Sequence, residues 1–187
     1  MVEATPQSFA PTHKYDRNFF LAFAALSWVA IVMGFSPELG GHLKGLTPYP
    51  PLIVHLHVVA FAGWMAQLTA QIWLIRSRRP DIHRKLGLAA VALVPIMVVL
   101  GVATTLVSRG LRFEAGQTEM LAFMIVPLTD MVLFPSFAVP ALLLRKDSAT
   151  HKRLILLATA MLLPAAFGRW IGPCPPSGPM RQKRGFS

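Results

Sequence analysis

The sequence predicts an all-α integral membrane protein, a bundle of about five transmembrane helices, and three observations lead to this prediction. First, 54% of the 187 residues are hydrophobic and only 14% are charged, whereas about a quarter of the residues in a soluble domain are charged. Second, charges are nearly absent from apolar runs long enough to cross a hydrocarbon core of about 30 Å. Third, Lys and Arg gather in alternate connections between these runs, as is typical of multi-span membrane proteins.

Five segments are predicted to span the membrane, each with close to the roughly 20 residues that a spanning helix needs. They cover residues 18–35, 52–75, 86–107, 120–144 and 154–172. The first is interpreted as a retained span, because its apolar run exceeds that of a signal peptide and no small-x-small cleavage motif follows it. Residues 1–17 then form a cytoplasmic N-terminal segment, residues 18–172 a transmembrane domain, and residues 173–187 a basic, Pro/Gly-rich tail that is expected to be disordered.

The basic residues predict the orientation, because cytoplasmic connections carry an excess of Lys and Arg. Eleven fall on one side, namely Lys14, Arg17, Arg76, Arg78, Arg79, Arg84, Lys85, Arg145, Lys146, Lys152 and Arg153. The other side has three, Lys44, Arg109 and Arg112. The N-terminus is therefore predicted to lie in the cytoplasm. The net charge of +10 is interpreted as this orientation signal and not as a nucleic-acid-binding surface, which needs a basic face on a folded polar domain.

Two predicted helix starts resemble each other and suggest an internal repeat. Each has an N-cap type residue, a histidine (His83 or His151), two basic residues and a Leu-x-Leu motif, and a proline (Pro95 or Pro164) follows the histidine by 12 or 13 positions. Two related helical hairpins would explain the match, and chance similarity of two membrane-entry sequences is the alternative. In a parallel repeat, His83 and His151 are equivalent positions that face one shared axis.

A polar stripe is predicted along the second segment. His57, Trp64 and Gln71 fall at heptad spacing, and Gln67 lies one turn before Gln71, so the four share a helix face. Because polar side chains are costly in lipid unless they meet protein, the stripe is expected to point into the bundle. It either forms interhelical hydrogen bonds or lines a cofactor or substrate pocket. His55 precedes His57 by two positions, so the two side chains point to different faces and make a weak ligand pair.

Asp130 lies near the middle of the fourth predicted span, where an ionised carboxylate is costly. It is therefore expected to be protonated or paired, and Arg169, near the outer end of the fifth segment, is the candidate partner. One interpretation is a structural pair. The other is an acid that transfers protons or binds a substrate, as in a small proton-coupled transporter.

The histidines at the two similar helix starts carry the sharpest functional hypothesis. A haem b iron takes two axial ligands, usually His, from facing helices, and nearby Arg or Lys neutralises the propionates. His83 with Arg84, and His151 with Arg153, meet this description. The alternative is that the two histidines only anchor helix ends at the membrane interface. No metal site beyond haem iron is predicted.

These motifs resemble those of a widespread family of bacterial multi-span membrane proteins that has no settled activity. The resemblance rests on His55-Leu-His57, His83-Arg84-x-x-Gly87 and His151-Lys152-Arg153-Leu154, and it covers roughly residues 18–171. A more distant likeness is to cytochrome b561-like proteins, which place their histidines within the spans. The resemblance implies the bacterial inner (cytoplasmic) membrane.

Together, these inferences predict a bacterial inner-membrane protein that binds haem b and transfers electrons within the membrane. The expected partners are the lipid bilayer and either other membrane proteins or further copies of the chain, with no nucleic acid. Two alternatives stay open: a non-catalytic accessory or scaffold subunit, and a small proton-coupled transporter that uses Asp130.

Overall fold

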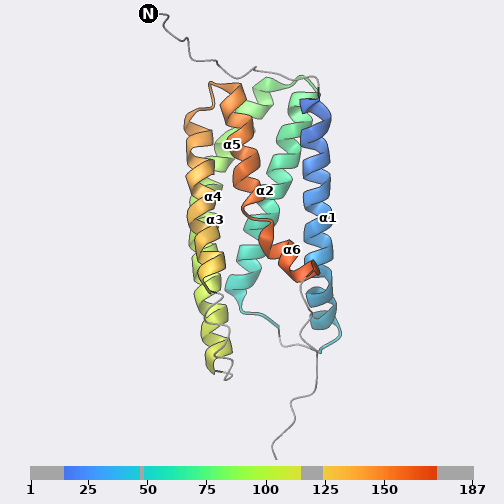
Figure 1. Cartoon of the computed structure of the whole chain (residues 1–187), viewed down its shortest axis with the longest axis vertical. Helices are drawn as coiled ribbons and strands as arrows, with labels where there is room; N and C mark the ends of the chain where they lie inside the picture. Colours follow the sequence, from blue (N-terminus) through green and yellow to red (C-terminus); the bar gives the residue numbers. More distant parts are fainter. Residues whose placement is uncertain (1–14, 47–48, 115–123, 172–187) are drawn as a thin grey trace, which may run out of the picture.

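The computed structural model describes residues 15–46, 49–114 and 124–171, and the described chain is helical and contains no strand. It forms an elongated bundle of parallel and antiparallel helices (Figure 1). The helices are α1 (Asp16–Leu43), α2 (Leu52–Arg76), α3 (Pro80–Glu114), α4 (Ile125–Leu143), α5 (Ser148–Ala160) and α6 (Pro164–Ile171).

Five helical stretches are long and apolar enough to cross a membrane, with α5 and α6 together making the fifth, Ser148–Ile171. Large apolar side chains also remain exposed around the outside of the bundle, among them Val59, Val99 and Val132. A lipid-facing surface explains that exposure, which a water-soluble bundle of this size would avoid. The predicted class is confirmed: the chain is a multi-pass, all-α membrane protein. The predicted tail, residues 173–187, lies outside the described residues.

The helices pack in the order in which they follow one another. Helix α2 packs against α3, α3 against α4, and α4 against α5, while α1 contacts both α2 and α6. The start of α1 and the connections α2–α3 and α4–α5 lie at one end of the bundle (Figure 1). We name it the basic end, because ten cations belong to it: Arg17, Arg76, Arg78, Arg79, Arg84, Lys85, Arg145, Lys146, Lys152 and Arg153.

The structure corrects several predicted boundaries. Helix α3 begins at Pro80 and not at residue 86, and α5 begins at Ser148 and not at residue 154. Hydropathy marks only the part of a helix that lies in hydrocarbon, whereas the polar first turns are set by local backbone chemistry. Proline suits the first helical position, and Asp147 caps α5 by accepting a hydrogen bond from the Ala149 amide at 3.0 Å.

The fifth predicted span is not one helix. Helix α5 ends at Ala160, and α6 begins at Pro164. Proline has no amide hydrogen and its ring clashes with the carbonyl group four residues earlier, which here belongs to Ala160. Proline alone does not decide the outcome, since α3 continues through Pro95. At the break the chain turns towards α1, where α6 finds a surface to pack on (Figure 1).

The contact between α6 and α1 depends on a glycine. A Cβ atom on Gly34 would lie 2.4 Å from the Ala166 carbonyl oxygen, so only glycine allows the two backbones to approach this closely. Further along α1, Arg169 lies 3.5 Å from a Glu38 carboxylate oxygen, and its guanidinium group sits 4.7 Å from the centre of the Phe35 ring. Helix α6 therefore closes the bundle against the first helix.

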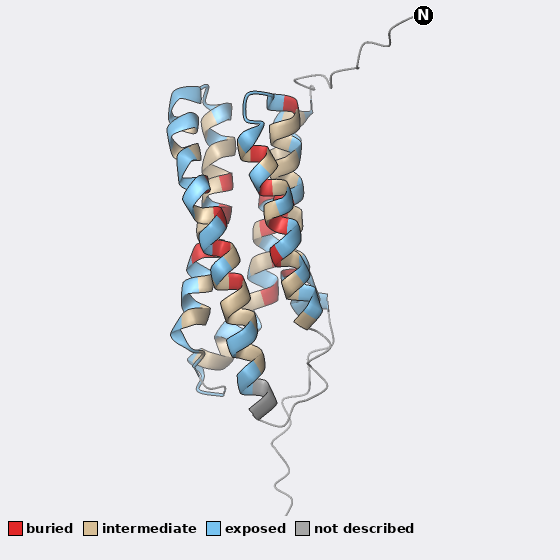
Figure 2. Cartoon of the chain, turned by 90° about the vertical axis from the view of Figure 1, so that its left-hand side faces the viewer, coloured by how far each residue is buried: buried red, intermediate tan, exposed pale blue. Residues whose placement is uncertain are grey.

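The buried core lies along the inside of the bundle at mid-height (Figure 2). Its centre is Trp64 of α2, which is 3% exposed. The Trp64 indole donates a hydrogen bond to the Thr159 hydroxyl of α5 at 3.1 Å. The edge of its ring meets the Phe134 ring of α4, with centroids 5.0 Å apart. The Trp64 side chain thus links α2 to both α4 and α5.

Candidate functional site

The structure brings His83 and His151 together inside the basic end. Their ring centroids lie 6.5 Å apart, and the ring planes are nearly perpendicular, at 89°. Each histidine is the fourth residue of its helix, α3 or α5. Each also donates its backbone amide to the residue just before the helix, Arg79 or Asp147. The two hairpins therefore place them in the same register, as the repeat predicts.

A backbone carbonyl group fixes the orientation of the His151 ring. Its Nδ1 atom lies 2.7 Å from the Ala141 carbonyl oxygen of α4. Because a carbonyl oxygen only accepts, the proton of a neutral ring lies on Nδ1, and Nε2 then has the lone pair. Ala141 is close to the end of α4, so the bond also satisfies one of the carbonyl groups that a helix end leaves open. A histidine held in this way has its other nitrogen ready to bind a metal ion.

The His83 ring is less completely satisfied. The Gln71 backbone carbonyl lies beside it, yet His83 Nδ1 is buried and makes no well-formed hydrogen bond within the described residues. The Gln71 side-chain oxygen is also buried and unpaired there, and its amide nitrogen packs against Gly87, 3.5 Å from where a Cβ would lie. Buried polar groups without partners are rare and call for an explanation, and two of them belong to residues of this site.

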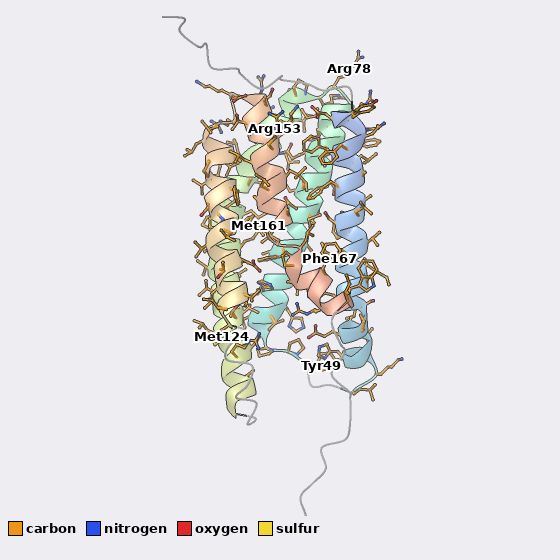
Figure 3. All side chains as sticks on the ribbon, viewed as in Figure 1. Tyr49, Arg78, Met124, Arg153, Met161 and Phe167 are labelled. Atoms are coloured by element: carbon orange, nitrogen blue, oxygen red, sulfur yellow. The ribbon has the colours of Figure 1, made fainter. Side chains whose placement is uncertain are left out.

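The electrostatic surroundings of the two histidines are strongly positive. Arg84 and Lys85 follow His83, and Lys152 and Arg153 follow His151. Lys152 forms an ion pair with Asp16 of α1, and an Arg153 Nη1 donates to the Ala149 carbonyl at 3.4 Å. Arg153 and Arg78 mark this end of the bundle in Figure 3. The remaining positive charge favours an anionic ligand over a bare cation.

The polar stripe of α2 faces into the bundle, as the sequence predicts. Trp64 belongs to the core, and the Gln67 side-chain amide donates to the Leu86 carbonyl of α3 at 3.4 Å. Gln71 lies beside the His83 ring. The stripe thus joins α2 to its neighbours, and only its end at Gln71 reaches the histidine pair.

His55 and His57 do not form a site with each other. His55 is exposed, and its Nδ1 lies 3.3 Å from the Pro51 carbonyl oxygen. His57 is half-buried against the Phe61 ring, with centroids 4.1 Å apart, and its Nδ1 has no partner among the described residues. Both belong to the half of α2 that is distant from the basic end.

The expected pair of Asp130 and Arg169 is wrong. The break before α6 carries Arg169 to α1, where its carboxylate partner is Glu38. Asp130 is half-buried, and it lies five residues after the first residue of α4, about 8 Å along the helix. It is therefore nearer the end of its helix than a span beginning at residue 120 suggests.

Sequence reasoning missed Thr159, Ala141 and Asp16. Thr159 is a polar residue in a run of apolar ones, and this pattern could have predicted an interhelical hydrogen bond there. The roles of Ala141, through its backbone, and of Asp16, across the bundle, depend on packing that no local pattern encodes. No family model, curated protein or solved structure matches the chain. The family resemblance stays a prediction.

Proposed function

We propose that the chain is a membrane electron-transfer protein that binds haem b between His83 and His151. The observation that supports this most is the separation of the two rings. Imidazole nitrogens about 2 Å from one metal ion place the ring centroids roughly 6 Å apart, and the observed separation is 6.5 Å. The separation is thus close to that expected for two imidazoles that would hold one iron between them.

The number of protein ligands also favours haem over a bare metal ion. Within the described residues, no group of three or more His, Cys, Asp and Glu side chains could hold a metal. Sites for single metal ions usually need three or four protein ligands. Haem brings ligands of its own for the iron, so two histidines from the chain would be enough to hold it.

Several residues have defined roles in this proposal. His151 would hold the iron through Nε2, because its Nδ1 faces the Ala141 carbonyl oxygen. His83 would supply the second ligand, and its buried Nδ1 has no hydrogen-bond partner among the described residues. Arg84 and Arg153 are the cations for the two propionates. Haem, when bound, supplies one-electron redox chemistry, and the chain's part is to orient the ligands and balance the charge.

Absorption spectroscopy tests the proposal on the full chain, purified in detergent from a host with ample haem. We expect a Soret band at about 410–430 nm with a low-spin spectrum. His83→Ala and His151→Ala should each remove the low-spin spectrum, and His55→Ala, an exposed histidine in the other half of the bundle, should leave it unchanged. Circular dichroism would check that each variant keeps its helices. A colourless, well-folded wild-type protein would overturn the proposal.

A second candidate is proton-coupled transport, which is supported by the broken fifth span. Spans interrupted near mid-membrane often form binding sites in transporters, and Asp130 is an ionisable residue within α4. Proton uptake into vesicles that is lost in Asp130→Asn would favour this candidate. A protein with neither haem nor proton uptake leaves the accessory or scaffold role.

The orientation is part of the same proposal. The basic end, and with it the N-terminus, faces the cytoplasm of a bacterial inner membrane. The excess of Lys and Arg at this end supports the orientation.

A further inference from the structure

We propose that a groove on the side of the bundle binds one anionic phospholipid from the leaflet at the basic end. This inference is independent of haem. The groove is open, has a volume of about 710 Å³ and lies between α1, α2 and α3. Its lining includes Trp28, Ala66, Thr69, Trp73, Ile82 and Leu86.

The groove offers hydrocarbon contacts and almost no polar ones. Thr69 is the polar exception, and its hydroxyl is already used: it accepts from the Trp28 indole at 3.0 Å and donates to the Met65 carbonyl at 2.8 Å. The Trp28 indole nitrogen is satisfied by the same contact. Apart from the Trp73 indole N–H, the lining side chains offer a polar substrate no further hydrogen-bonding partner, whereas an acyl chain needs none.

The length of the groove fits one leaflet. On α2 the lining runs from Ala66 to Leu74, a rise over eight residue steps, or about 12 Å along the helix. Half of a hydrocarbon core is about 15 Å thick. The groove thus accommodates most of an acyl chain that starts at the basic end, and it stops before the bilayer centre.

One arginine stands where the headgroup would lie. Arg76 follows Leu74 by two residues on α2, and its Nη1 donates to the Arg17 backbone carbonyl at 2.6 Å. This bond ties the ends of α1 and α2 together beside the groove. Arg76 keeps further N–H donors for a phosphate. Basic pockets between helices at this depth bind anionic headgroups, and this complementarity favours a lipid over a partner helix.

The lining provides its own probe, because Trp28 and Trp73 are fluorescent and brominated acyl chains quench tryptophan on contact. The full chain in uncharged detergent is titrated with phosphatidylglycerol or phosphatidylcholine that carries brominated chains. We expect half-maximal quenching at a clearly lower mole fraction of phosphatidylglycerol. The Trp28→Phe/Trp73→Phe variant should lose this difference, since its other tryptophans, Trp64 and Trp170, do not line the groove.

Matched charge variants test the headgroup. Arg76→Gln should raise the phosphatidylglycerol requirement about fivefold, and Arg145→Gln, an exposed arginine in the α4–α5 connection, should not change it. Native mass spectrometry should then show one phosphatidylglycerol retained per chain. Equal quenching by the two lipids, an Arg76→Gln variant identical to wild type, or a lipid-free dimer would each overturn the proposal, and the dimer would identify a second copy as the occupant.

Discussion

Replacing Gly34 with alanine is predicted to weaken the contact that closes the bundle. The new Cβ would lie 2.4 Å from the Ala166 carbonyl oxygen and 3.0 Å from its carbonyl carbon and Cα. Ordinary contacts begin near 3.4 Å, so α6 would have to move by about 1 Å. All three obstructing atoms are backbone, and no side-chain rotation relieves them. Overpacking of this kind typically costs about 1–3 kcal/mol.

The same substitution has an opposing effect, because alanine favours a helix over glycine by about 1 kcal/mol. Gly40→Ala separates the two effects. Gly40 lies in the same helix, and a Cβ there meets no atom within 4 Å. Both variants gain helix propensity, and only Gly34→Ala strains the packing. The difference in their free energies of unfolding, about 1–3 kcal/mol, is therefore the packing cost, and reversible unfolding in mixed micelles measures it.

Two results would refute this reasoning. One is a Gly34→Ala protein as stable as Gly40→Ala, which would mean that α6 does not pack closely on α1. The other is rescue of Gly34→Ala by Ala166→Gly. The strain comes from backbone atoms of residue 166. Removing the Ala166 side-chain methyl group by Ala166→Gly should therefore leave the strain in place.

Three further predictions follow from the core, the α5 cap and the charge distribution. Trp64→Phe leaves a smaller side chain in the core, and Thr159→Val also removes the hydroxyl's bond to the Ile155 carbonyl, but both remove the Trp64–Thr159 hydrogen bond. A double-mutant cycle should therefore give a coupling of about 1 kcal/mol, and purely additive losses would contradict this. The Thr150 hydroxyl, with the Thr150 and Ala149 amides, lowers the pKa of the Asp147 carboxyl below its usual 3.8. The stabilisation by the cap is therefore complete above about pH 3.8, the unfolded pKa, and is lost as the pH falls through the lower pKa of the folded state. Asp147→Ala should therefore unfold at a lower temperature than wild type at pH 7, and the two unfolding temperatures should converge in strong acid. Reporter fusions after residues 78 and 148 should report the cytoplasm, and a fusion near residue 112 the outside; a cytoplasmic signal at 112 would reverse the proposed topology.

The sequence predicts the spans well because apolar length is a property of each segment alone. The meeting of His83 with His151 is also predictable, since two hairpins with the same helix-start pattern place their fourth residues in one register. The partner of Arg169 is not predictable in this way. It depends on the interruption of the helix after Ala160 and on Gly34 in α1. The effect of both on the position of Arg169 appears only when α6 packs against α1.

The closure of α6 on α1 also has a consequence for biogenesis. Gly34 and Ala166 lie about 130 positions apart, so their contact is among the least local in the chain. While the chain is being made, the face of α1 around Gly34 has no protein partner and must be covered by lipid or by the insertion machinery. Lipid bound beside α1 early in synthesis would therefore be present before α6 is made, and α6 would have to displace it from the Gly34 face in order to dock.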